Sequence, residues 1–272
     1  MEKNQAKQQG KKKRRGVKSV QKPYLKGTVY NAGALKRSGK ILLYYIIYMF
    51  FFLMVGAALN FKSMLLNVLL NAGAVVATIG MTYMEGLKNG DSDVSVGEIA
   101  HVRRESGREV EKADMDRSYH PLKGALIALI GAAPLLLLGL VHAVCAEPQT
   151  YTLGTLPGWL DSISAEEVQL PLAYYNRDTS MGMIQVVRIL VRLSLLPYIN
   201  IISTENIQVL LLLDRISPLL MLLPALGYAA GYLRGPVSRS YTHGKIAANT
   251  RRHKRKQQKE QKARQSQNKQ II

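Results

Sequence analysis

Five apolar blocks dominate this chain, and each is close to the length that an α-helix needs to cross a lipid bilayer. A helix spans the hydrocarbon core with about 20 mostly apolar residues, because it rises about 1.5 Å per residue. The pattern therefore predicts an all-α integral membrane protein. The blocks are Ile41 to Leu59, Ser63 to Met84, Leu122 to Ala146, Ile184 to Ser203 and Ile207 to Leu233.

The basic charge is concentrated at the two ends of the chain. Lysine and arginine number 37 against 18 aspartates and glutamates, a formal net charge of +19. Most of them lie in residues 1–40 and 234–272, beside the first and last apolar blocks. The positive-inside rule places such tails on the cytoplasmic side, here of the cell membrane. Two cytoplasmic ends require an even number of crossings, so we expect one block not to span.

Residues 184–203 form the block that we expect not to span. Gln185, Arg188 and Arg192 recur at i, i+3 and i+7, which gives one polar stripe on an otherwise apolar helix. Each arginine would cost roughly 2.5–3.5 kcal/mol at the centre of a span. Such a helix prefers the membrane interface, and Pro197 and Asn200 are expected to end it.

The expected fold is four transmembrane helices plus one outer interfacial amphipathic helix, with disordered basic termini. The connection after the second block mixes both charge signs, whereas the one after the third is mostly acidic, as an outside loop would be. The predicted order is a basic cytoplasmic tail (1–40), a transmembrane hairpin (41–86), a charged cytoplasmic loop (87–121), a third transmembrane helix (122–146), an outer loop with the interfacial helix (147–206), a fourth transmembrane helix (207–233) and a second basic cytoplasmic tail (234–272).

An adjacent acid and base, Asp214 and Arg215, interrupt the last apolar block. Counting back about 20 residues from Arg234 places the pair at the outer end of that span. One hypothesis is therefore a boundary pair that reaches into the headgroups. The alternative is a buried pair with a functional role, because ionisable groups inside a membrane are usually functional.

Small and polar residues recur at helical spacing inside three of the blocks. Lipid is as apolar as leucine, so membrane helices associate through close backbone approach and interhelical hydrogen bonds. The stripes therefore predict helix packing, and the alternative is that the polar stripe of the second block lines a solute path. The stripe residues are Asn67, Asn71 and Thr78 in the second block, Gly124 and Ala128 in the third, and Gly227 and Gly231 in the last.

The sequence contains no phosphate-binding loop, nucleophile elbow or zinc-protease motif. The segment after Asp91 resembles the start of a calcium loop but has Val96 where the turn needs glycine and Val102 where a glutamate belongs. His142 and Cys145, at i and i+3, are half of a metal site or simply a histidine at the interface. We therefore expect no enzyme activity, no cofactor and no metal.

Two functions remain as hypotheses. The first is an accessory or scaffold subunit of a membrane complex, whose partners are the lipid bilayer, anionic lipids through the tails, and another membrane protein or a second copy. The alternative is a component of a small-solute or ion transporter or channel, in which six polar residues converge on a solute. These are Asn67, Asn71, Arg188, Arg192, Asp214 and Arg215. Contact of the tails with nucleic acid or the ribosome is a further interpretation, although residues 251–264 lack an aromatic residue for base stacking.

Overall fold

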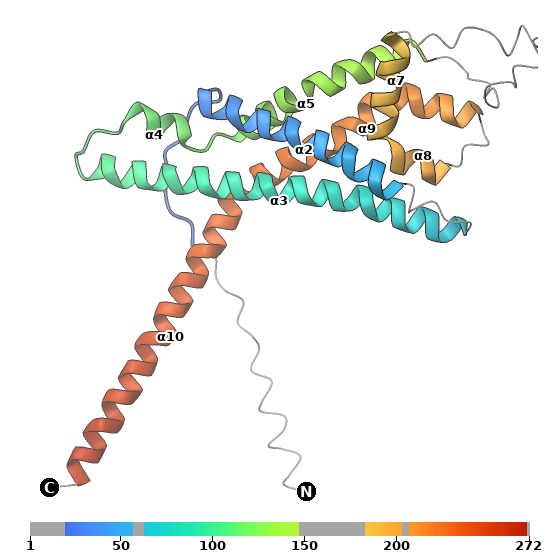
Figure 1. Cartoon of the computed structure of the whole chain (residues 1–272). Coiled ribbons are helices and arrows are strands. Elements are labelled where there is room, and N and C mark those ends of the chain that lie inside the picture. Colours follow the sequence, from blue (N-terminus) through green and yellow to red (C-terminus); the bar gives the residue numbers. More distant parts are fainter. Residues whose placement is uncertain (1–19, 57–62, 147–182, 203–206, 271–272) are drawn as a thin grey trace, which may run out of the picture. The chain divides into compact units, whose positions relative to one another are not determined.

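The computed structural model describes residues 20–56, 63–146, 183–202 and 207–270 of the chain, and every element in these ranges is a helix (Figure 1). The chain was expected to be all-α, and in the described ranges it is. The elements are α2 (Ala32–Gly56), α3 (Met64–Glu105), α4 (Lys112–Arg117), α5 (Pro121–Val144), α7 (Met183–Ser194), α8 (Leu196–Ile202), α9 (Ile207–Leu233) and α10 (Gly235–Gln270).

The helices belong to two compact units, which are described separately. The apolar unit holds the described parts of residues 29–86 and 121–231. The polar unit holds the described parts of residues 1–28, 87–120 and 232–272. α3 and α9 contribute to both units, because each continues past the end of its apolar stretch.

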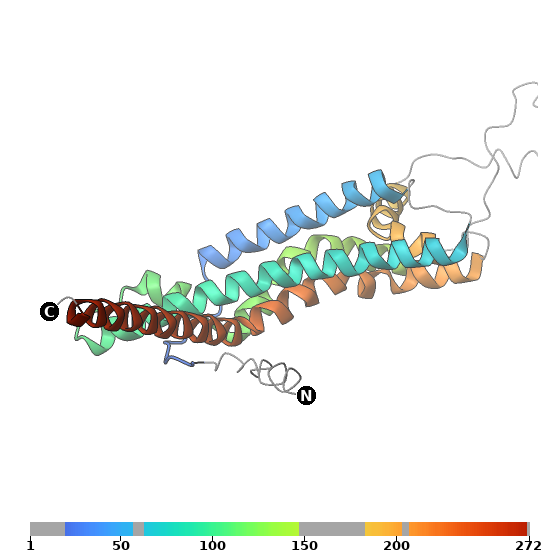
Figure 2. The same cartoon turned by 90° about the horizontal axis from the view of Figure 1, so that it is seen from below.

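Four helices are long and apolar enough to cross a membrane: α2, α3, α5 and α9. In the apolar unit they pack through small residues. A side chain at Gly131 of α5 would collide with the Ser38 carbonyl of α2, and one at Gly227 of α9 with Ile79 of α3. Figure 2 shows these helices running along one another within the unit. The composition and packing are compatible with a multi-pass membrane protein.

The apolar unit buries several polar side chains and exposes many large apolar ones. Asn71, Asp214 and Ser217 are almost completely buried, whereas large side chains such as Met54 and Leu219 are mostly exposed. A water-soluble fold has the opposite arrangement, since burial of apolar surface stabilises it. Exposed leucine and buried polar groups are the arrangement expected where lipid replaces water as the solvent.

The block at residues 184–203 is two helices rather than one. α7 and α8 meet at Leu195 with a bend of 77°. Pro197 lies in the first turn of α8, where proline fits, and it cannot donate the hydrogen bond that would continue α7. The charged stripe of α7 also faces inward, because Ile184 and Ile189 are exposed while Arg192 pairs with a buried carboxylate.

The C-terminal basic segment is helical, not disordered as expected. α10 runs from Gly235 to Gln270. It lacks an apolar stripe, but lysine, arginine, glutamine, glutamate and alanine are strong helix formers, and they dominate its second half. The N-terminal tail was also expected to be disordered. Its residues 1–19 lie outside the described ranges, and α2 already begins at Ala32.

The segment 87–121, expected as a charged loop, is helical as far as Glu105. In the polar unit the extended residues 20–28 cover it, with the Leu25 amide donating to the Gly97 carbonyl at 3.1 Å. Tyr232 donates from its hydroxyl to Asp93 at 2.7 Å and stacks on Tyr119. These contacts stabilise a helical stretch that its own residues would support only weakly.

Candidate functional site

Asp214 is the centre of a buried ion cluster in the apolar unit. Its carboxylate accepts hydrogen bonds from Arg192, with Nη2 at 2.7 Å from Oδ2 and Nε at 3.3 Å from Oδ1. Nε2 of His142 lies 3.2 Å from Oδ1. The side chains of Asp214 and His142 are 3% and 1% exposed. A bidentate arginine contact is the strongest way to satisfy a carboxylate away from water.

Three helices bring the cluster together, one residue each. His142 comes from the last turn of α5, Arg192 from the last turn of α7 and Asp214 from the second turn of α9. Gly139 of α5 lies against Pro218 and Met221 of α9, and this close approach places His142 beside Asp214. The cluster therefore fixes α7 to both helices.

The adjacent residues Asp214 and Arg215 do not act as a pair. Asp214 is buried, whereas Arg215 is exposed. Successive residues on a helix are separated by about 100°, so neighbours face different sides. The partner of Asp214 is Arg192, 22 residues earlier in the sequence. The pair is therefore divided between the interior of the unit and its surface.

An asparagine network forms a second polar cluster in the same unit. The Asn71 amide donates to Asn67 Oδ1 at 2.8 Å, and the Asn67 amide donates to the Asn200 carbonyl at 2.6 Å. The Asn200 amide donates to the Gly56 carbonyl at 3.1 Å and to Asn71 Oδ1 at 3.2 Å. The network ties α8 to the end of α2 and the start of α3. The bent pair α7 and α8 thus lies at the end of the apolar unit where α2 ends and α3 begins.

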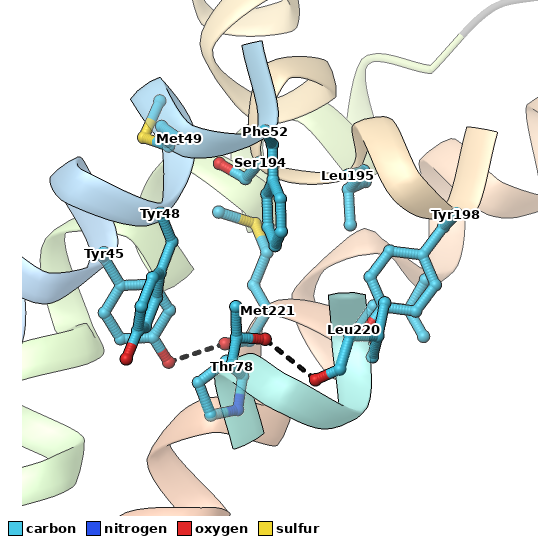
Figure 3. A pocket seen from close by; sticks show the side chains of 12 residues that line it. Tyr45, Tyr48, Met49, Phe52, Thr78, Ser194, Leu195, Tyr198, Leu220 and Met221 are labelled. Atoms are coloured by element: carbon cyan, nitrogen blue, oxygen red, sulfur yellow. Dashed lines mark hydrogen bonds between the residues drawn. The ribbon is translucent and has the colours of Figure 1, made fainter. Parts of the chain in front are cut away.

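Thr78, the third residue of that predicted stripe, borders a small cavity (Figure 3). Its hydroxyl donates to the Val75 carbonyl at 2.8 Å, and the Tyr45 hydroxyl donates to the Met221 carbonyl at 2.7 Å. Tyr48, Phe52 and Tyr198 complete the aromatic wall. The cavity measures about 30 Å³, which holds a water molecule or two and is far too small for a substrate.

The other predicted residues have different surroundings. Nε of Arg188 is buried and has no hydrogen-bond partner among the described residues. Gly124 and Ala128 are buried in α5, and Gly227 and Gly231 are buried in α9. Ala128 also lines an open groove of about 430 Å³ between α5 and α9, whose other lining residues include Ala125, Ala225 and Ala229.

His142 is a site residue whose contact with Asp214 was not predicted from the sequence. It was expected at the interface or in a metal site, but it is buried beside Asp214. Across the described residues, no group of three or more His, Cys, Asp and Glu side chains could hold a metal ion. The sequence carries no local signal for this contact, because His142 and Asp214 lie on different apolar segments.

The polar unit contains a second carboxylate with arginine and histidine partners. Oε2 of Glu98 lies 3.1 Å from Nε of Arg239, and Oε1 lies 2.8 Å from Nε2 of His243. All three side chains are at least three-quarters buried. Glycines bring the two helices together, since a side chain at Gly90 would collide with the Tyr232 carbonyl and with Gly235. Tyr119 lies in the same unit, and its own burial raises the pKa of its hydroxyl.

Comparison with known proteins found no similar protein. No protein-family model, no curated protein and no solved structure matches the chain. The fold therefore defines only a broad class: an all-helical chain whose four apolar helices are compatible with a multi-pass membrane protein.

Proposed function

We propose that this protein is a non-enzymatic, polytopic membrane protein that serves as an accessory or scaffold subunit of a membrane complex. It crosses the cell membrane four times, with both basic ends on the cytoplasmic side in contact with anionic lipid. Its partner is another membrane protein or a second copy of the chain, held through the helices of the apolar unit.

The observation that carries this proposal is how the buried polar groups are used. Asp214 is hydrogen-bonded to Arg192, and the asparagines of the second cluster are hydrogen-bonded to one another. The cavity beside Thr78 holds little more than water. A solute path needs polar groups that face an open space at membrane depth. Groups that satisfy one another instead fix the positions of helices, which is the property that a scaffold requires.

The groove between α5 and α9 supports a partner within the membrane. It is open, about 430 Å³ in volume, and lined by alanine, leucine and valine. Small residues along a groove let a neighbouring helix approach closely, and close packing is a main source of affinity between helices in lipid.

Crosslinked co-purification from native membranes, analysed by mass spectrometry, tests the proposal. A stoichiometric partner is expected, and Ala125→Trp should reduce its recovery at least tenfold by filling the groove. Leu137→Trp, on an exposed position of α5 outside the groove, should leave recovery unchanged. Recovery of the chain alone as a monomer, with both variants behaving like the wild type, would contradict the proposal.

A transporter or channel component is the second candidate, favoured by the broken helix pair. Discontinuous helices often border substrate sites in transporters, and α7 and α8 meet at 77° with Arg188 in α7. Arg188→Gln distinguishes the two functions. Loss of uptake of one solute with an intact complex would favour transport, whereas unchanged uptake favours the scaffold.

A further inference from the structure

The first turns of α10 have a packed side and an open side. Arg239 and His243 contact Glu98 of α3, and Ser240 is buried beside them. Val237 and Tyr241 are 64% and 47% exposed. Lys245 lies over the Tyr241 ring, with Nζ 4.6 Å from its centroid. An apolar and aromatic surface is therefore left open on the side of α10 away from Glu98.

The open side continues into a basic face. Arg255 follows Val237, and Lys259 follows Tyr241, by roughly five full turns at 3.6 residues per turn, so each pair faces the same direction. Arg251, Arg252 and Lys256 flank this line. All five are exposed, and within the described residues none pairs with a carboxylate. We call Arg251, Arg252, Arg255, Lys256 and Lys259 the basic face.

The packed side continues mainly as uncharged glutamine, with Lys254 as the exception, since it follows His243 by roughly three turns. Gln257 follows Arg239, and Gln261 follows His243, by the same roughly five turns. Both glutamines are exposed. Among the described side chains of residues 251–261, the five residues of the basic face lie on the open side and Lys254 alone lies on the packed side. The positive charge of this stretch is therefore concentrated on one side, which suits a flat anionic surface. A duplex groove would instead present phosphates on two sides of an inserted helix.

We propose that the basic face of α10 binds the anionic phospholipid headgroups of the cytoplasmic membrane surface, with Tyr241 and Val237 at headgroup level. The inference rests on the proposed membrane function and names the surface that makes the lipid contact. Tyrosine is enriched at membrane interfaces because its ring is apolar and its hydroxyl is polar. Basic residues near a leaflet are attracted by its negative surface potential. The contacts of Arg239 and His243 with Glu98 hold the opposite side of α10 and leave this face free.

The test uses the full-length protein in nanodiscs of phosphatidylcholine, titrated with vesicles of phosphatidylcholine and phosphatidylserine in equal parts. Arg255→Gln with Lys259→Gln should weaken vesicle binding about 30-fold, because each basic residue contributes about 1 kcal/mol and 1.4 kcal/mol is a factor of ten. Gln257→Glu with Gln261→Glu changes the net charge equally on the packed side. We expect less than a threefold effect from that control.

Equal weakening by the two variants would show that only total charge matters, and the proposal of a face would be wrong. No weakening by either variant would also overturn it. Tighter binding to duplex RNA than to the vesicles, lost in the Arg255 and Lys259 variant, would assign the face to nucleic acid instead. Failure to recover a membrane partner would contradict the accessory role but would leave the vesicle titration unaffected, so the two failures are distinguishable.

Discussion

Asp214 and Glu98 have partners of the same residue types but lie in different units of the protein. Each is a buried carboxylate between one arginine and one histidine. Asp214 lies among apolar helices, and its partners come from two other helices, α5 and α7. Glu98 lies in the polar unit, and both of its partners come from the first turns of α10, four residues apart.

Asp214 joins three helices whereas Glu98 joins two, so the two carboxylates should contribute differently to stability. Removal of the Asp214 carboxylate would leave Arg192 without a counter-charge at the junction of three helices. Removal of Glu98 would release one helix, whose partly exposed Arg239 can recover solvation from water. A buried charge is most costly when its partner is removed and water cannot replace it. Loss of Asp214 should therefore lower the free energy of unfolding more than loss of Glu98, although the hydrogen-bond distances in the two clusters are similar.

Asp214→Asn should be the most destabilising of these changes, by about 3 kcal/mol or more, because it leaves Arg192 unpaired in a buried site. Thermal unfolding of the purified protein in mild detergent measures the effect. Arg215→Gln, at the exposed neighbour, should stay within about 0.5 kcal/mol of the wild type. Equal effects at the two positions would contradict the assignment of Asp214 as the central residue.

The double variant Asp214→Leu with Arg192→Met should recover most of that loss. Replacement of an entire buried ion pair by apolar residues of similar volume is often neutral or stabilising. Unfolding of both single variants and the double variant gives the coupling energy. If the double variant is as unstable as the sum of the singles, the two side chains do not interact directly.

Glu98→Gln should have a smaller, local effect of about 1–2 kcal/mol, because its partners keep some access to water. Hydrogen exchange by mass spectrometry should show faster exchange in α10 from Gly235 to Gly244. Exchange in α5 should not change. Glu260→Gln, exposed on the same helix, is the control and should alter nothing in the first turns of α10.

Asn200→Ala should have the smallest effect, about 0.6 kcal/mol and at most about 1.7 kcal/mol, the average and maximum for hydrogen bonds between membrane helices. The change removes the two bonds from the Asn200 amide to Gly56 and Asn71. Thermal unfolding measures it, with Ser194→Ala as a control, since that hydroxyl donates to Leu190 within its own helix. An effect as large as that of Asp214→Asn would reverse the ranking of the two polar clusters.

The apolar blocks were sufficient to predict the class of fold and the positions of four long helices, although α2 begins earlier and α3 ends later than its apolar block. Hydropathy is local, and about 20 apolar residues in a row leave few alternatives to a spanning helix. The bend between α7 and α8 was partly readable, because Pro197 marks it. The helix at residues 235–270 was missed, since high charge was taken as disorder although its residues favour a helix.

The partners of the buried charges could not be predicted in the same way. His142, Arg192 and Asp214 lie on three different apolar segments, and no spacing rule joins residues that are far apart in the sequence. Asp214 stood beside Arg215, and the local pattern suggested that pair, but helix geometry turned the two residues to different sides. The sequence by itself determined which segments are apolar and long enough to span a membrane. Only the tertiary structure decided which charges meet, because that depends on how closely glycines such as Gly139 and Gly90 let the helices approach.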